Sequence, residues 1–196
     1  MITIRSTALA VAALLFLAGG VVLTPGPAVA AAAPSSTGVV YLFRGAFNIF
    51  STGMDQIAKK LRARGIEAKS TSYADWPAFA AEAKTRYAQT HLPIILVGHS
   101  FGANAAVLLA AKLEESHTPV ALLILFDTVS SMKISANVRR AIDFVSTDGR
   151  GAGITVTGEL GFVGGIDRVK LREGHLAMDT DRHNQDISIA AILKVI

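Results

Sequence analysis

The sequence predicts an α/β fold in which a doubly wound, mostly parallel sheet is flanked by helices. Short, continuously apolar segments alternate with longer segments of helical period along the chain. The apolar segments do not alternate with polar residues, which is typical of strands buried on both faces of a parallel sheet. Their repeated strand–helix order fits parallel strands joined by right-handed crossovers.

The regular alternation runs from residue 39 to residue 126. Its predicted strands are 39–43, 66–73, 93–97 and 120–126. The first helix begins near Thr52, which has the spacing of a capping box with Asp55. The second helix follows Asp75 as its cap, with Pro77 in the first turn. The third helix, 101–115, is apolar on nearly all sides in its first half, and we expect it to be buried.

The last third of the chain is less regular. Segments 141–145 and 166–171 predict two more strands, and 181–196 predicts a closing helix. Seven glycines lie between residues 149 and 165, which indicates a loop or an irregular hairpin rather than a helix. There is no internal repeat.

Residues 1–30 have the layout of a secretory signal peptide. Arg5 precedes the apolar run Ala8–Leu23, and Ala28-Val29-Ala30 offers the small residues that a signal peptidase reads. The run has 16 residues, fewer than the about 20 of a spanning helix, although an uncleaved anchor is the alternative. We therefore expect cleavage near Ala30, a loose lead-in at 31–37, and one extracytoplasmic domain at 38–196, periplasmic or secreted, with no stable membrane span.

Charge and residue content argue against several classes of function. The formal net charge is +4, and the basic residues are dispersed, so nucleic-acid binding is not indicated. The chain has no cysteine, which excludes disulfides and thiolate catalysis. No group of acidic residues and histidines has metal-ligand spacing, and no phosphate-binding glycine loop is present, so we expect neither a metal nor a cofactor.

The run Gly98-His99-Ser100-Phe101-Gly102 has the form of a nucleophile elbow. A Gly-x-Ser-x-Gly match alone is weak, but here it follows a buried strand and leads directly into an apolar helix. A sharp turn needs glycines on both sides of the serine, and it aims the first amides of the helix at a reacting oxygen. We therefore predict Ser100 as a nucleophile.

A serine hydroxyl needs a base to take its proton, and the chain has five histidines. His175 is the predicted base, because it follows strand 166–171 and so lies at the carboxyl edge of the sheet. His183 is expected at the surface of the closing helix. His99 lies inside the elbow, where its side chain should point away from the serine. His91 and His117 belong to the opposite edge of the sheet.

The base in turn needs a carboxylate to orient it. Asp127 is the predicted acid, because it ends the strand that follows the elbow helix. Asp148, after the next strand, is the alternative acid. Asp143 and Asp167 belong to strands, away from this edge. Asp179 lies four residues after the predicted base and can instead brace its loop.

These residues resemble a known group. The elbow, the Phe-Asp-Thr that ends the following strand, and the late Gly-His-Leu-Ala-Met look like the thioesterase and lipase-like branch of the α/β-hydrolase superfamily, over residues 39–179. In that branch a serine, an acid and a histidine follow one another along the chain, as Ser100, Asp127 and His175 do here. The resemblance implies hydrolysis of a small acyl-ester or thioester substrate, and it does not choose between the two.

The resemblance also implies an oxyanion hole made of backbone amides. One donor is expected from Phe101, and a second from Gly45 or Ala46 in the loop after the first strand. Asn48 or Ser51 can add a side-chain donor.

The short distance along the chain between the predicted acid and base argues against a large lid. Only 48 residues separate Asp127 from His175, and two strands must fit between them. The glycine-rich segment 149–165 is therefore a flap or a plain surface loop.

Two other functions stay open for the same fold: a non-catalytic binding module, and an acyltransferase that uses the same residues.

Overall fold

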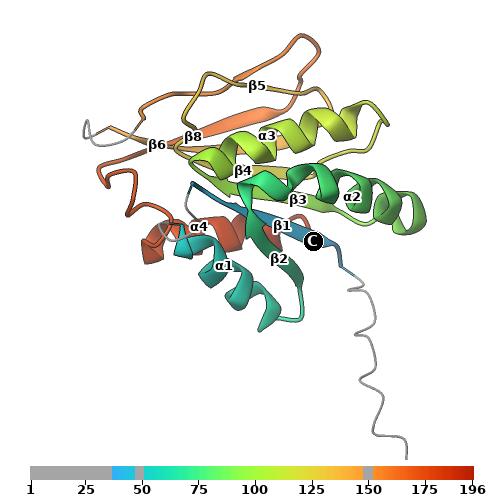
Figure 1. Ribbon diagram of the computed structural model, residues 1–196, viewed down its shortest axis with the longest axis horizontal. Helices are drawn as coiled ribbons and strands as arrows, with labels where there is room; N and C mark the ends of the chain where they lie inside the picture. Colours follow the sequence, from blue (N-terminus) through green and yellow to red (C-terminus); the bar gives the residue numbers. More distant parts are fainter. Residues whose placement is uncertain (1–36, 47–50, 148–151) are drawn as a thin grey trace, which may run out of the picture. The chain divides into compact units, whose positions relative to one another are not determined.

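The computed structural model describes residues 37–46, 51–147 and 152–196. The chain divides into two units, Met1–Ala33 and Pro34–Ile196. The expected signal peptide lies outside the described residues, as does the lead-in before Thr37. In the second unit, helices cover both faces of a central sheet (Figure 1). No helix of the described part of the chain is both long and apolar enough to cross a membrane.

The central sheet has six strands that all run parallel, in the order β2-β1-β3-β4-β6-β8. The strands are β1 Val39–Arg44, β2 Glu67–Ser72, β3 Ile94–His99, β4 Leu122–Phe126, β6 Arg140–Ser146 and β8 Gly165–Leu171. Each is predicted from the sequence, with ends that differ by at most two residues. The doubly wound parallel sheet is therefore confirmed.

Four helices of the described residues pack on this sheet, two on each face. They are α1 Thr52–Arg62, α2 Trp76–Thr90, α3 Phe101–Glu114 and α4 Arg182–Leu193. Helices α1 and α4 share one core, whereas α2 and α3 share the other (Figure 1). A short 3₁₀ turn, η1 Tyr73–Asp75, leads into α2. Successive strand residues point to opposite faces, so Tyr41 joins one core and Leu42 the other, which explains the continuous apolar runs.

The helix starts differ from the capping pattern that the sequence predicts. The capping box of Thr52 and Asp55 is wrong, because Ser51 is the N-cap of α1 and its side chain makes no capping hydrogen bond. Asp55 instead forms an ion pair with Arg44 at 3.0 Å. Asp75 does precede α2, but its side chain also makes no capping hydrogen bond.

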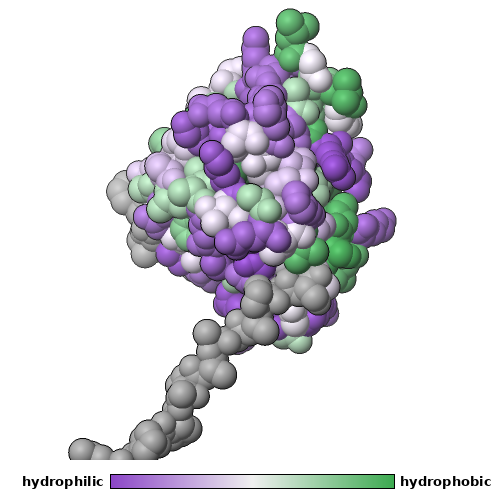
Figure 2. All heavy atoms as spheres, turned by 90° about the vertical axis from the view of Figure 1, so that its right-hand side faces the viewer, coloured by the Kyte–Doolittle hydropathy of each residue, from purple (hydrophilic) through white to green (hydrophobic). Residues whose placement is uncertain are grey.

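The described part of the glycine-rich segment contains one short strand, β7, and otherwise has no regular secondary structure before β8. A second, two-stranded parallel sheet joins β5 Lys133–Ile134 to β7 Thr157–Gly158, and Phe162 packs against the core. Leu160 and Val163, in the turn before β8, are fully exposed. Figure 2 shows mostly hydrophilic and weakly apolar side chains on the face it presents, with hydrophobic groups at the top and along the right-hand edge. None of the described residues between Asp127 and His175 lies in a helix.

Candidate active site

Ser100 occupies a strained turn between β3 and α3. Its φ of 60° and ψ of −125° are rarely adopted by residues other than glycine. A Cβ atom on Gly98 would lie 2.1 Å from the carbonyl oxygen of Gly102, and one on Gly102 would lie 2.0 Å from the carbonyl oxygen of Phe43. Both glycines are therefore required by close backbone approach, which is the physical reason for the sequence pattern.

The structure brings Ser100, His175 and Asp127 together at the carboxyl edge of the sheet. His175, in the loop after β8, has Nε2 2.9 Å from Ser100 Oγ. Its Nδ1 lies 2.7 Å from Oδ2 of Asp127, the first residue after β4. The serine is 7% exposed and the aspartate is fully buried, while the histidine is half-buried and so open to solvent on one side.

The hydrogen-bond pattern assigns the imidazole proton. An ionised carboxylate only accepts hydrogen bonds, so Nδ1 of His175 carries the hydrogen and donates it to Asp127. The Nε2 lone pair of His175 is then free to accept the hydroxyl hydrogen of Ser100. This is the arrangement in which an imidazole can remove a proton from a serine.

Hydrogen bonds from His175 and from backbone amides keep the aspartate ionised. Asp127 Oδ2 also accepts from the amide of Ala152 at 2.7 Å, and Oδ1 accepts from Gly153 and Ser146, each at 3.3 Å. Burial acts to raise the pKa of Asp127, but the hydrogen bonds from His175 and from the amides outweigh it and hold the pKa below its usual value. The described end of the glycine-rich segment is thus anchored to this carboxylate.

The other acidic candidates differ in position. Asp148 lies outside the described residues. Asp143 is buried within β6 and accepts from the guanidinium of Arg168 at 3.2 Å. Asp167, within β8, forms an ion pair with Arg140 at 2.6 Å. The last two are therefore held within the sheet, as the sequence indicates.

The expected oxyanion donors need one correction. The amide of Gly45 donates to Ser51 Oγ at 2.8 Å, so it is not free to bind a substrate oxygen. Ser51 is itself engaged by this bond, and Asn48 lies outside the described residues. The amides of Phe101, at the start of α3, and of Ala46 remain as candidate donors.

A second histidine lies beside the first, and its contacts were not foreseen from the sequence. The ring of His99 is 4.8 Å from that of His175, centroid to centroid. Its Nδ1 lies 2.7 Å from Ser51 Oγ and its Nε2 lies 2.7 Å from the backbone oxygen of His175. Asp179 Oδ2 lies 3.9 Å from Nδ1 of His99 and accepts from the amide of Gly53. The one signal in the sequence was a polar residue at the end of a buried strand.

Burial shifts the pKa values of His99 and Asp179 toward the neutral form of each side chain. Burial, followed by the nearby charge of His175, lowers the pKa of His99 to about 4. Burial raises the pKa of Asp179 to about 7, and no hydrogen-bond partner for its Oδ1 is found among the described residues. Asp179 also braces the loop of His175 through the Gly53 amide, as the sequence suggested.

The raised pKa of Asp179 predicts a dependence of stability on pH. Between about pH 4 and 7 the unfolded carboxyl loses its proton while the folded one keeps it, so rising pH favours unfolding. Asp179→Asn removes this effect. The unfolding free energy of the variant relative to wild type should rise across this range by at most ~1.4 kcal/mol per pH unit and then level off. Urea unfolding at several pH values measures it. A difference that does not change with pH would contradict the assignment, and Asp186→Asn, at an exposed aspartate of α4, is the control measured in parallel.

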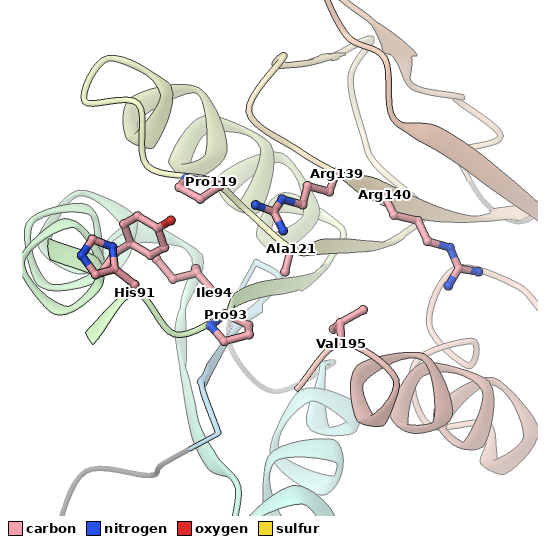
Figure 3. A pocket seen from close by; sticks show the side chains of 9 residues that line it. His91, Pro93, Ile94, Pro119, Ala121, Arg139, Arg140 and Val195 are labelled. Atoms are coloured by element: carbon pink, nitrogen blue, oxygen red, sulfur yellow. The ribbon is translucent and has the colours of Figure 1, made fainter. Parts of the chain in front are cut away.

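A pocket away from this site lies at the opposite edge of the sheet. It has a volume of about 370 Å³, and its lining includes His91, Arg139 and the first residues of β3 and β6, Ile94 and Arg140 (Figure 3). Ser100 follows the other end of β3, so this pocket is separate from the site described above. His183 is exposed on α4. Within the described ranges there is no group of three or more residues suited to hold a metal ion.

Among the solved structures similar to this chain, one with a TM-score above 0.5 supports the fold. The human thioesterase 2 structure aligns with a TM-score of 0.55 at 13% identity, over 81% of this chain and 95% of that one. A protein of the α/β hydrolase superfamily from Xanthomonas campestris pv. campestris gives 0.48 at 12% identity, over 81% and 99%. The NocB thioesterase domain from the nocardicin cluster gives 0.43 at 15% identity, over 81% and 93%. No curated protein sequence matches the chain.

The family is established by sequence. The family described as "Thioesterase domain" matches residues 32–156, more than half of the chain. The match includes Ser100 and Asp127 and ends before His175. Hydrolysis of esters or thioesters is the general activity that this membership supports. The chain belongs to the thioesterase domain family and is a hydrolase of the thioesterase and lipase-like branch of the α/β-hydrolase superfamily.

Proposed function

We propose that the protein is an exported serine hydrolase that cleaves a carboxylic ester or thioester through an acyl-enzyme on Ser100. The observation that carries this proposal is the pair of contacts made by His175, 2.9 Å to Ser100 Oγ and 2.7 Å to Asp127 Oδ2. The strained backbone of Ser100 supports it independently, because such strain is typical of functional sites.

Acylation begins when Ser100 Oγ attacks the carbonyl carbon of the substrate and its proton passes to Nε2 of His175. The carbonyl oxygen becomes an oxyanion, which the amides of Phe101 and Ala46 stabilise. Asp127 stabilises the imidazolium and keeps it oriented. The intermediate then collapses: the bond to the leaving oxygen or sulfur breaks, that atom takes the proton from His175, and the acyl group stays on Ser100.

Deacylation repeats these steps with water. His175 takes a proton from the water as its oxygen attacks the acyl carbon, and the same amides hold the second oxyanion. Collapse of this intermediate returns the proton to Ser100 Oγ and releases a carboxylic acid. His99 is neutral at the pH of such a reaction, so it adds no charge that opposes the imidazolium of His175.

An apolar surface beside the reacting groups suits an acyl chain. Phe101 is 47% exposed, and its ring contacts that of Tyr73 with the centroids 5.5 Å apart. Leu176, next to His175, is 59% exposed. We name Tyr73, Phe101 and Leu176 the acyl shelf. Tyr73 and Phe101 contact each other at the elbow, and Leu176 follows the histidine in the chain, so these side chains offer apolar contact to an acyl chain near the reacting groups.

The acyl shelf predicts a chain-length effect. Phe101→Ala keeps the backbone amide but removes the ring, so kcat/KM for an octanoyl ester should fall about 10-fold, the loss of roughly 1.4 kcal/mol of apolar contact. The value for an acetyl ester should stay within about twofold, because that substrate does not reach the ring. Steady-state hydrolysis of both esters measures the effect. Leu193→Ala, a similarly exposed leucine on α4, is the matched control. Equal losses for the two esters would contradict a shelf for the acyl chain.

Export is supported by the charged, apolar and small-residue order of residues 1–30. Sequencing the amino terminus of the protein recovered from outside the cytoplasm tests it. A terminus just after Ala30 is expected, and a full-length amino terminus in that fraction would contradict cleavage.

The proposed activity is tested by comparing an octanoyl oxoester with the matched octanoyl thioester. Wild type should hydrolyse at least one of them, and Ser100→Ala should lower kcat by about 10⁴-fold or more. Ser116→Ala, in the turn that follows α3, should behave as wild type. Adding an alcohol during turnover separates hydrolase from acyltransferase, because a transferase gives the new ester as its main product. Ser100→Ala with wild-type turnover, or wild type with none, would refute the proposal.

A further inference from the structure

His99 makes two short contacts that the proposed mechanism does not use. It ends β3, directly before Ser100, and its side chain is only 1% exposed. One ring nitrogen, Nε2, lies 2.7 Å from the backbone oxygen of His175, and the other, Nδ1, lies 2.7 Å from Ser51 Oγ. A buried polar ring with both nitrogens paired connects two loops that lie far apart in the sequence.

The partners determine where the protons lie. A carbonyl oxygen only accepts, so Nε2 of His99 carries a hydrogen and donates it to His175. In a neutral ring Nδ1 is then an acceptor, and it takes the hydroxyl hydrogen of Ser51. Ser51 Oγ in turn accepts the amide hydrogen of Gly45 at 2.8 Å. The hydrogen bonds therefore run in one direction, from the loop after β1, through Ser51 and His99, to the loop that carries the base.

We propose that His99 is a positioning residue: its Nε2–H tautomer holds the backbone carbonyl of His175 and so sets the distance between the His175 imidazole and Ser100 Oγ. The inference rests on the proposed function, because it assigns a role in delivering the base. Ser51 fixes the tautomer of His99. Through its bond with the Gly45 amide, it also links His99 to the loop that supplies the oxyanion donor Ala46.

The need for such a residue follows from the loop itself. His175 lies between β8 and α4, in a stretch with no helix or strand, and its side chain is 21% exposed, so neither regular secondary structure nor full burial holds the loop in place. A displacement of about 1 Å at a reacting group can cost on the order of 10²-fold in rate. His99 belongs to β3, which is hydrogen-bonded to β4 and buried, so it offers this loop a rigid reference beside the nucleophile.

Two conservative substitutions separate positioning from simple packing. The side-chain amide of Gln reaches the position of Nε2 and can donate to His175, whereas that of Asn reaches only the position of Nδ1 and can pair only with Ser51. His99→Gln should therefore retain most of the kcat that His99→Asn loses. Asn should lower kcat by about 10- to 100-fold with KM within about twofold, and Gln should stay within about fivefold of wild type.

The experiment measures kcat and KM for the octanoyl ester, together with urea unfolding, on wild type, His99→Gln, His99→Asn and the exposed control His183→Gln. Recovery of kcat by Gln, with similar unfolding midpoints for Gln and Asn, supports positioning. Equal losses of kcat in Gln and Asn, or a wild-type kcat in Asn, would overturn it while leaving the proposed function intact. Absence of turnover in wild type itself would refute the proposed function and this inference together.

Wild-type protein gives a test that depends on no variant. Histidine ¹⁵N spectra distinguish the two neutral tautomers. His99 should carry its hydrogen on Nε2 and none on Nδ1 near neutral pH. A hydrogen on Nδ1 would leave the His175 carbonyl without its donor and would overturn the inference, even if both His99 variants failed to fold.

Discussion

Asp127→Asn should lower kcat/KM for ester hydrolysis by about 10⁴-fold, with a much smaller change in KM. Both oxygens of this buried carboxylate accept hydrogen bonds, Oδ2 from His175 and Ala152, and Oδ1 from Gly153 and Ser146. The amide NH₂ of Asn therefore faces a hydrogen-bond donor in either orientation. When it faces Nδ1 of His175, it favours the tautomer with the hydrogen on Nε2, which cannot accept the proton of Ser100.

The two rival acids make this prediction specific. Asp148→Asn should leave kcat/KM within about twofold of wild type if Asp127 is the acid. Asp167→Asn, which removes an exposed partner of Arg140, controls for loss of a carboxylate on the same sheet. Steady-state kinetics on all three variants decide the matter. A large loss in Asp148→Asn together with a small one in Asp127→Asn would mean that the acid is misassigned.

Gly102→Ala should destabilise the protein by about 3 kcal/mol or more and abolish detectable hydrolysis. The new Cβ would lie 2.0 Å from the carbonyl oxygen of Phe43 and 2.9 Å from that of Arg44. Both atoms belong to the backbone of β1, so only a movement of α3 away from this strand relieves the overlap. That movement shifts Ser100 and the amide of Phe101 together, which removes the nucleophile and an oxyanion donor at once.

Gly165→Ala is the matched control for this substitution. A Cβ at Gly165 meets no atom within 4 Å, and the residue does not need a positive φ. Its unfolding free energy and its kcat/KM should both stay close to wild type. Urea unfolding and ester turnover, measured on the two alanine variants in parallel, test the comparison. Similar stability of Gly102→Ala and Gly165→Ala would show that the elbow is not closely packed against β1.

Much of the fold was predictable because its signals are local. The runs 94–97 and 122–126 are apolar at every position, and such runs occur when both faces of a strand are buried. The elbow was predictable for a similar reason. A Cβ on Gly98 or Gly102 would overlap backbone atoms that lie within a few residues or in the adjoining strand, so both positions need glycine. The positions of Asp127 and His175 followed from a rule of topology, because residues after parallel strands meet at one edge of the sheet.

The remaining features depend on contacts that no local pattern records. Strands β5 and β7 have two residues each, too few to show a period. The amide of Gly45 was expected to face the substrate, but it donates its hydrogen bond to the hydroxyl of Ser51, six residues later. The partner of His99 Nε2 lies 76 residues away, in a loop whose conformation is set by tertiary contacts. A sequence gives the residue types of such a network but not their pairing.

Fluorophosphonate labelling of the purified protein tests the central claim most directly, because the probe reacts with a serine only where a neighbouring base activates it. Intact mass and peptide mapping should place a single adduct on Ser100 in wild type. Labelling should be absent in Ser100→Ala and strongly slowed in Asp127→Asn. An adduct on another residue, or labelling that persists unchanged in Ser100→Ala, would contradict the assignment of Ser100 as the nucleophile.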